Sequence, residues 1–263
     1  MNRLTQACIM IFFAAAVLQA SVTDLYLRYV KEELRPFLIA ASLLLIAAAV
    51  MTLWYELRPD PGTTADRTNP DDREATNAEQ ATSGSPAAVT HDGHAHHEPR
   101  VAWLLILPAL GLLLVAPPAL GSYAAGQAGT AVTTQQDYGD DYPPLPAGDP
   151  ARTTVLDYAA RALFDKGQSI GNRRVELTGF VTPGPDGQPI LARMVMSCCA
   201  ADGRPVKLGM SGNAPTGLAN DTWIQVTGRY TDRLTRDPVN DEEIPYIEVD
   251  FWRQVTAPKD PYD

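Results

Sequence analysis

Several catalytic signatures are missing from this chain of 263 residues. It has no Walker A loop, no HExxH helix and no Cys-x-x-Cys pair of the kind that thiol oxidoreductases carry. All four histidines lie between His91 and His97, so the region after them has none for a Ser-His-Asp triad. These absences argue against hydrolase chemistry, and we expect a protein that is not an enzyme.

Basic residues are also scarce, with 21 Lys and Arg against 31 Asp and Glu and a formal charge of -10. This balance argues against a nucleic-acid partner. Between Arg100 and Arg152 there is no Lys or Arg at all. Under the positive-inside rule, such a stretch is typical of a flank that has been translocated across a membrane.

Long apolar runs occupy 4–20, 36–57 and 101–123. Because a hydrocarbon layer about 30 Å thick needs roughly 20 helical residues, the runs predict three transmembrane helices. A signal peptide is the alternative for the first run. Its weak positive start at Arg3 and the poor cleavage pattern at 18–20 favour an uncleaved helix.

The distribution of basic residues predicts the topology. An amino terminus in the cytoplasm places one larger group of arginines inside: Arg3, Arg58, Arg67, Arg73 and Arg100. Only a smaller group then lies outside: Arg28, Lys31 and Arg35. We therefore expect a multi-pass protein of the cell membrane that contacts lipid, with a cytoplasmic linker and a C-terminal domain outside.

Five segments follow from composition. We expect two transmembrane helices over 1–57, a disordered linker over 58–100, a third transmembrane helix over 101–123, a flexible tether over 124–151 and an extracytoplasmic β domain over 152–263. The linker lacks aromatic residues and cannot bury a core. The tether is rich in Gly, Ala, Thr, Asp and Pro.

The linker ends in a cluster of imidazole and carboxylate side chains: His91, His94, His96, His97, Asp92 and Glu98. Neutral imidazoles suit Zn²⁺, Ni²⁺ and Cu²⁺, and a flexible loop can wrap several of them around one ion. Binding must also order the segment, so we expect weak and exchangeable metal sites. A polar tract without a function is the alternative interpretation.

The sequence of the β domain predicts a membrane-anchored α+β protein whose soluble part is a small OB-like barrel with one flanking helix. Thr154 and Asp157 form a capping box that starts the helix, and Gly167 ends it. Five alternating runs predict strands: 173–182, 190–199, 205–210, 222–231 and 246–255. Gly179 and Gly228 lie within strands, where a small barrel bends, and a β-sandwich is the alternative fold.

The segment MVMSCCAADG carries adjacent cysteines at Cys198 and Cys199, with Asp202 close behind. Neighbouring side chains of a regular strand face opposite ways, so two ligands for one ion require a break such as a bulge at Cys199. Thiolates with a carboxylate suit Zn²⁺, whereas nearby thioethers favour Cu⁺: Met194, Met196 and Met210. A strained vicinal disulfide and inert packing are the other interpretations.

The segments LLLVAPPALGSYAA and SCCAAD, with the predicted spans and the His-bearing linker, resemble the YcgQ-like family of permease-associated small membrane proteins. The resemblance implies an accessory subunit of a larger integral-membrane permease, linked to zinc or related metal homeostasis. It assigns the site to Cys198, Cys199 and Asp202. A thiol-redox membrane protein and an OB-like interaction module with inert cysteines are the rival hypotheses.

Overall fold

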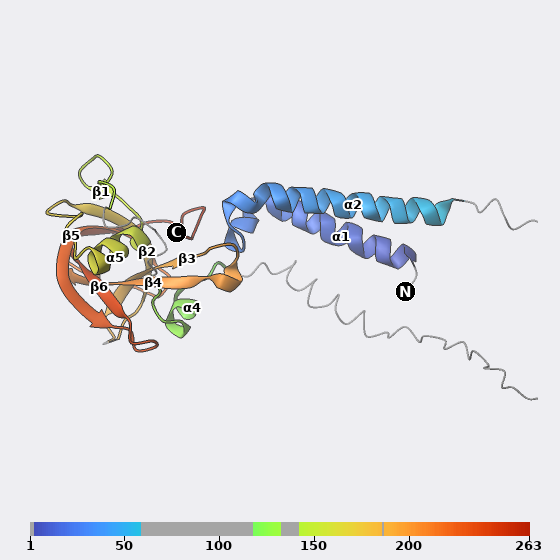
Figure 1. The fold of residues 1–263 in the computed structure, drawn as a ribbon. Coiled ribbons are helices and arrows are strands. Elements are labelled where there is room, and N and C mark those ends of the chain that lie inside the picture. Colours follow the sequence, from blue (N-terminus) through green and yellow to red (C-terminus); the bar gives the residue numbers. More distant parts are fainter. Residues whose placement is uncertain (1–2, 59–117, 133–141, 186) are drawn as a thin grey trace, which may run out of the picture. The chain divides into compact units, whose positions relative to one another are not determined.

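The computed structural model describes residues 3–58, 118–132, 142–185 and 187–263, drawn in colour in Figure 1. The chain divides into two compact units. Among the described residues, one comprises 3–14 with 43–58, and the other comprises 15–42 with 118–132, 142–185 and 187–263.

Two apolar helices open the chain, α1 (Arg3–Val22) and α2 (Arg35–Leu57). The connector between them, residues 23–34, contains two 3-10 turns, η1 (Leu25–Arg28) and η2 (Glu32–Leu34).

Within the described residues, one helical stretch is long and apolar enough to cross a membrane, Glu32–Tyr55. The apolar part of α1, Ala7–Val22, is shorter than the usual spanning length because Thr5 and Gln6 interrupt its start. The third predicted span lies outside the described residues except for its end, 118–123, where the prediction is wrong: 118–121 are not helical, and the Leu120 amide donates to the Tyr262 hydroxyl. The prediction of three transmembrane helices is therefore supported for one of them only.

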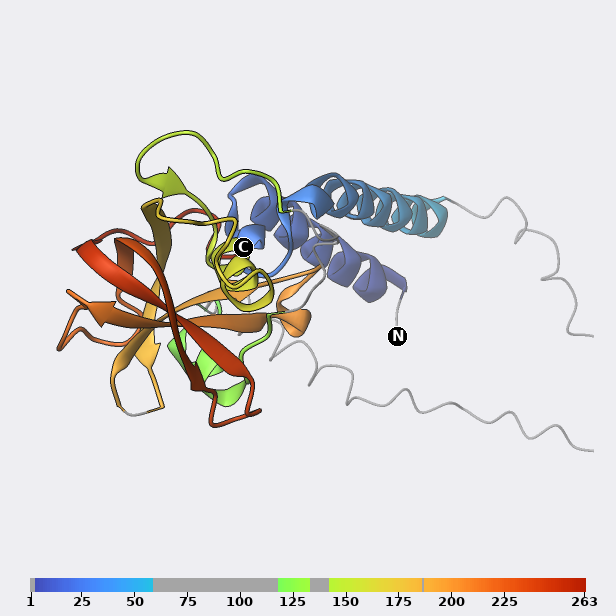
Figure 2. The same cartoon turned by 60° about the vertical axis from the view of Figure 1, so that its left-hand side comes forward.

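The C-terminal region folds into a closed five-stranded barrel (Figures 1 and 2). Its strands are β2 (Val175–Pro183), β3 (Pro189–Val195), β4 (Arg204–Gly212), β5 (Trp223–Arg236) and β6 (Glu243–Gln254). They follow the order β2-β3-β4-β6-β5, and pairing of β2 with β5 closes the barrel. A short strand, β1 (Ala151–Arg152), adds to β2 in parallel. The predicted small barrel is confirmed.

Glycines allow two strands to bend where the barrel closes. A Cβ on Gly179 would lie 2.6 Å from the carbonyl oxygen of Ala192, and one on Gly228 would lie 2.3 Å from that of Glu248. The pairing of β5 with β6 shifts register at Gly228. Both mid-strand glycines thus allow a backbone approach that any side chain would block.

The flanking helix is α5 (Val155–Phe164), and it covers the barrel core. The Thr154 side chain accepts a hydrogen bond from the backbone of Asp157, as the capping pattern predicted. Its apolar face joins the main core cluster through Tyr158. The buried Tyr158 hydroxyl donates to the carbonyl oxygen of Tyr246 at 2.8 Å, which ties the helix to β6.

The segment predicted as a flexible tether packs on the barrel in both of its described parts, the second through Leu145, which is buried in the main core cluster. The short helix α4 (Ser122–Gln127) joins Phe180 and Tyr262 in a second buried cluster. Further along, Lys207 forms a buried ion pair with Asp237 at 2.8 Å, and its ammonium also donates to the Ala128 carbonyl at 2.9 Å. A polar composition therefore does not prevent this segment from being held by buried hydrogen bonds.

Candidate metal-binding site

The adjacent cysteines lie in the loop between β3 and β4, which we define as the dithiol loop, residues 196–203. β3 ends at Val195, so both cysteines follow the strand, and the bulge predicted within a strand at Cys199 is replaced by a loop. Cys199 has an extended backbone, and a 3-10 turn, η4 (Ala200–Asp202), returns the chain to β4.

Asp202 shapes the dithiol loop by accepting hydrogen bonds from the backbone. Its carboxylate oxygens accept from the amides of Ser197 at 3.0 Å and Cys198 at 2.8 Å. These bonds fold the chain back on itself immediately after the strand, because the carboxylate reaches amides four and five residues before it. The Asp202 side chain is thus held beside the two thiols.

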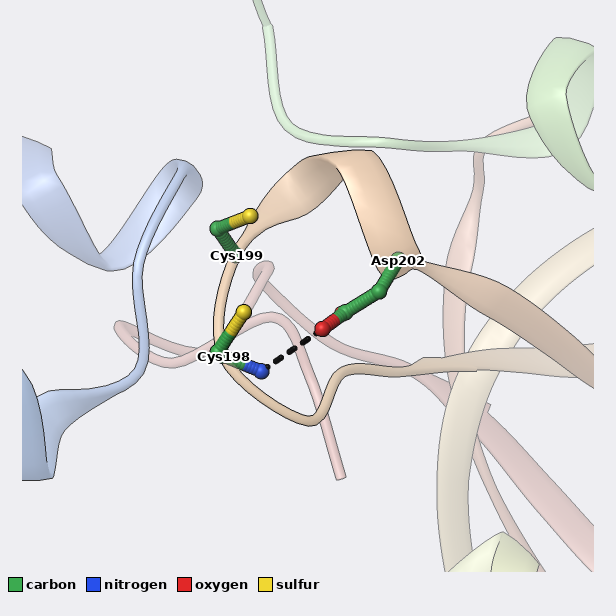
Figure 3. A group of neighbouring side chains, drawn as sticks. All are labelled: Cys198, Cys199 and Asp202. Carbon is green, nitrogen blue, oxygen red and sulfur yellow. Dashed lines mark hydrogen bonds between the residues drawn. The ribbon is translucent and has the colours of Figure 1, made fainter.

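Ligand atoms of Cys198, Cys199 and Asp202 all lie within 4.8 Å of one another (Figure 3). Cys198 is exposed, and the other two side chains are half-buried. Both cysteines are free thiols. The structure thus brings together the three residues proposed from the sequence, in a group that can hold a metal ion.

Hydrogen bonding sets the charges in this group. The Cys198 thiol donates to Asp202, which lowers the pKa of that carboxyl, and backbone amides lower it further. The same hydrogen bond is the largest cause that raises the pKa of Cys198, to about 11. At neutral pH the group therefore pairs a carboxylate with a protonated thiol. A cation that replaces the thiol proton would relieve the repulsion between two negative groups.

The remaining predicted ligands divide into two sets. The histidine cluster lies outside the described residues: His91, His94, His96 and His97. The methionines considered for Cu⁺ are buried members of the two core clusters: Met194, Met196 and Met210. Because these methionines pack in the core, packing is sufficient to explain them. The donors that the structure brings together are therefore two thiols and a carboxylate.

A second chain segment lies beside the dithiol loop, and no sequence pattern predicted it. Val30, in the connector between α1 and α2, forms an isolated antiparallel bridge with Cys199. A single bridging valine between two short 3-10 turns carries no periodic pattern, and a pairing across such a distance in sequence leaves no local signal.

Comparison with known proteins finds one family model that matches part of the chain. No curated protein and no solved structure matches the chain. Residues 1–160 lie outside the family match, which covers the dithiol loop and all five strands of the barrel. This match supports the resemblance to the YcgQ-like family for the β domain only. Residues 161–262 match the DUF1980 C-terminal domain.

Proposed function

We propose that this protein is a non-enzymatic, membrane-anchored accessory subunit of a permease, and that it presents Cys198, Cys199 and Asp202 outside the membrane to a metal ion. Zinc is the first candidate and Cu⁺ the alternative, because the donors are two sulfurs and one carboxylate oxygen. The role in metal homeostasis and the permease partner come from the family resemblance.

The convergence of the three donors carries this proposal. The two cysteines and the aspartate offer ligand atoms within 4.8 Å of one another, in a loop whose backbone is already held by the aspartate. Structural zinc sites are closed by four protein ligands, whereas sites that exchange a ligand keep a position open. Three donors with Cys198 exposed suit an ion that is received and passed on.

The charges near the thiols favour cation binding over thiol-redox chemistry. Reactive cysteines have a lowered pKa because a cationic group or a helix amino terminus stabilises the thiolate. Here the neighbouring group is a carboxylate, and the pKa of Cys198 is raised. A thiolate is disfavoured in this environment, whereas a divalent cation bound between the sulfurs and the carboxylate is favoured.

The connector supports the predicted topology. Its contacts with the dithiol loop favour a placement of both segments on the same side of a membrane. If α2 crosses the membrane, this placement needs a second crossing before the barrel, and we propose that the part of the apolar run 101–123 that lies outside the described residues supplies it. α2 is suited to lipid, because it exposes large apolar side chains such as Phe37, Leu44 and Trp54.

The histidine cluster fits the same proposal as a second, weaker ligand set. The topology predicted from charge places it in the cytoplasm, on the opposite side from the thiols. An ion that crosses through a partner permease would then meet thiols on one side and imidazoles on the other.

A zinc titration of the full chain in detergent tests the proposal. The background carries alanine at the cluster histidines, so that only the dithiol loop competes with a chromophoric chelator: His91, His94, His96 and His97. We expect one bound zinc, lost in the C198S/C199S double variant and kept in a C8S control, whose cysteine lies in α1. Equal zinc uptake by the double variant and its parent would contradict the proposal. The same titration with Cu⁺ under reducing conditions decides between the two ions.

A further inference from the structure

The dithiol loop is bonded to the connector on both sides of Cys199. The backbone amide of Lys31 donates to the carbonyl of Cys198 at 3.2 Å, and the amide of Ala200 donates to the carbonyl of Tyr29 at 2.7 Å. Cys199 and Val30 face each other between these two bonds. Figure 3 shows the blue connector running beside the loop that carries both sulfurs. The backbone of Cys199 therefore cannot shift without straining a bond to the connector.

The connector is itself held in place. Tyr26 and Leu27 in η1 are buried, and the Arg35 guanidinium at the start of α2 lies 5.7 Å from the centre of the Tyr26 ring. Backbone amides of Tyr29 and Val30 both donate to the Tyr26 carbonyl at 2.8 Å. The connector thus forms a short, internally bonded segment between the end of α1 and the start of α2.

A second contact fixes the connector to the barrel. The buried Tyr262 hydroxyl donates to the Arg28 carbonyl at 2.7 Å and accepts from the Leu120 amide at 3.1 Å. Tyr262 also bridges in parallel with Met194 near the end of β3, immediately before the dithiol loop. The dithiol loop and Tyr262, which pairs with β3 just before that loop, therefore hold the connector at two points.

We propose that the connector is a positioning element of the ion site, and that ion binding at the thiols is coupled through Lys31 and Tyr29 to the adjoining ends of α1 and α2. This inference rests on the proposed function. Donors that now lie up to 4.8 Å apart must each come within about 2.0–2.3 Å of one zinc ion. The loop tightens as they converge, and the bonded connector responds with it.

Coupling of this kind is reciprocal. If ion binding stabilises the bonds between loop and connector, then those bonds must raise ion affinity by the same factor. The connector is consequently part of the binding site in energetic terms, although it supplies no ligand atom. A barrel excised from the chain would lack this contribution.

A proline substitution isolates the coupling. Lys31 has a φ of -62°, which proline adopts without strain, so K31P removes the donor to Cys198 while keeping the backbone path. K31A removes the same charged side chain and keeps the donor. We expect zinc affinity in the full chain to fall about threefold to tenfold in K31P, as for the loss of one hydrogen bond, and to stay unchanged in K31A.

Hydrogen exchange on the unsubstituted chain gives a second measurement that does not depend on the variant folding. Zinc should slow exchange at the amides of Lys31 and Ala200 and leave that of Leu177, in the barrel core, unchanged. Equal zinc affinity in K31P and K31A would overturn the coupling. Hydrogen-exchange rates at the Lys31 and Ala200 amides that are the same with and without zinc would also overturn it. Absence of zinc binding to the unsubstituted chain would instead overturn the proposed function, and the coupling with it.

Discussion

Replacing Asp202 with asparagine removes the charge that keeps the neighbouring thiol protonated. The amide oxygen of asparagine can still accept one of the two backbone hydrogen bonds that the carboxylate receives from Ser197 and Cys198. The loop should therefore keep its shape at a cost of about 1 kcal/mol. Because hydrogen bonding to Asp202 is the first cause of the raised pKa, the pKa of Cys198 should fall from about 11 toward its ordinary value of 9.0.

The size of the effect on reactivity follows from these two values. At pH 8 a thiol with a pKa of about 11 is ionised roughly once in a thousand molecules, and one with a pKa of 9.0 about once in ten. This is a gain of about a hundredfold in thiolate. A less basic thiolate is also a weaker nucleophile, with a Brønsted coefficient of about 0.4–0.5. As the pKa falls from about 11 to 9.0, this lowers the rate constant of each thiolate by roughly tenfold. We expect D202N to raise the alkylation rate of Cys198 at pH 8 by up to about tenfold, because Cys199 and burial also contribute to the raised pKa.

The assay is alkylation of the full chain with iodoacetamide between pH 7 and 11, with peptide mass spectrometry to separate Cys198 from Cys199. The pH midpoint reports the pKa directly. D250N serves as the control, because Asp250 pairs with Arg229 on a different part of the barrel. Identical midpoints for Cys198 in D202N and the parent chain would refute the electrostatic argument.

Three further outcomes are expected. Zinc affinity should rise at least about tenfold per pH unit from pH 6 to pH 8, because binding must displace the Cys198 proton; a titration series that shows no pH dependence would contradict this. K207M should lower the free energy of unfolding by about 3–5 kcal/mol in a denaturant titration, because it leaves Asp237 buried without its cation, and a loss below about 1 kcal/mol would count against that ion pair. G228A should lower the free energy of unfolding by about 1–3 kcal/mol, because its Cβ would meet a carbonyl oxygen of β6 at 2.3 Å. The Cβ of G126A would meet no atom within 4 Å, so this variant should be neutral or slightly stabilising. Equal melting temperatures of the two variants would refute the packing argument.

The barrel could be predicted because apolar and polar residues alternate along its strands, and because the residues that start or bend its elements act on their own neighbourhood. Thr154 and Asp157 mark the start of α5, and Gly179 and Gly228 mark the bends, each through a constraint on its own neighbourhood. The burial of Phe180 could not be predicted in this way. It faces away from the main core and is covered by α4 and Tyr262, which come from distant parts of the chain.

The residues of the site could be predicted from the sequence, but the loop that brings them together could not. The run from Met194 to Cys199 is composed of residues that strands accept, so the end of β3 at Val195 has no signature in its own composition. The break comes from the carboxylate of Asp202, which competes for the backbone amides of Ser197 and Cys198. The contact between Val30 and Cys199 depends on the tertiary fold alone.

X-ray absorption spectroscopy of the zinc-loaded full chain tests the central claim most directly. The sample carries alanine at all the cluster histidines, so that the spectrum reports the dithiol loop alone: His91, His94, His96 and His97. We predict two sulfur scatterers at about 2.3 Å from the zinc, from Cys198 and Cys199, with the remaining scatterers being oxygen at about 2.0 Å. A zinc shell made of oxygen and nitrogen alone, without sulfur, would contradict the claim that the adjacent thiols and Asp202 converge on one ion.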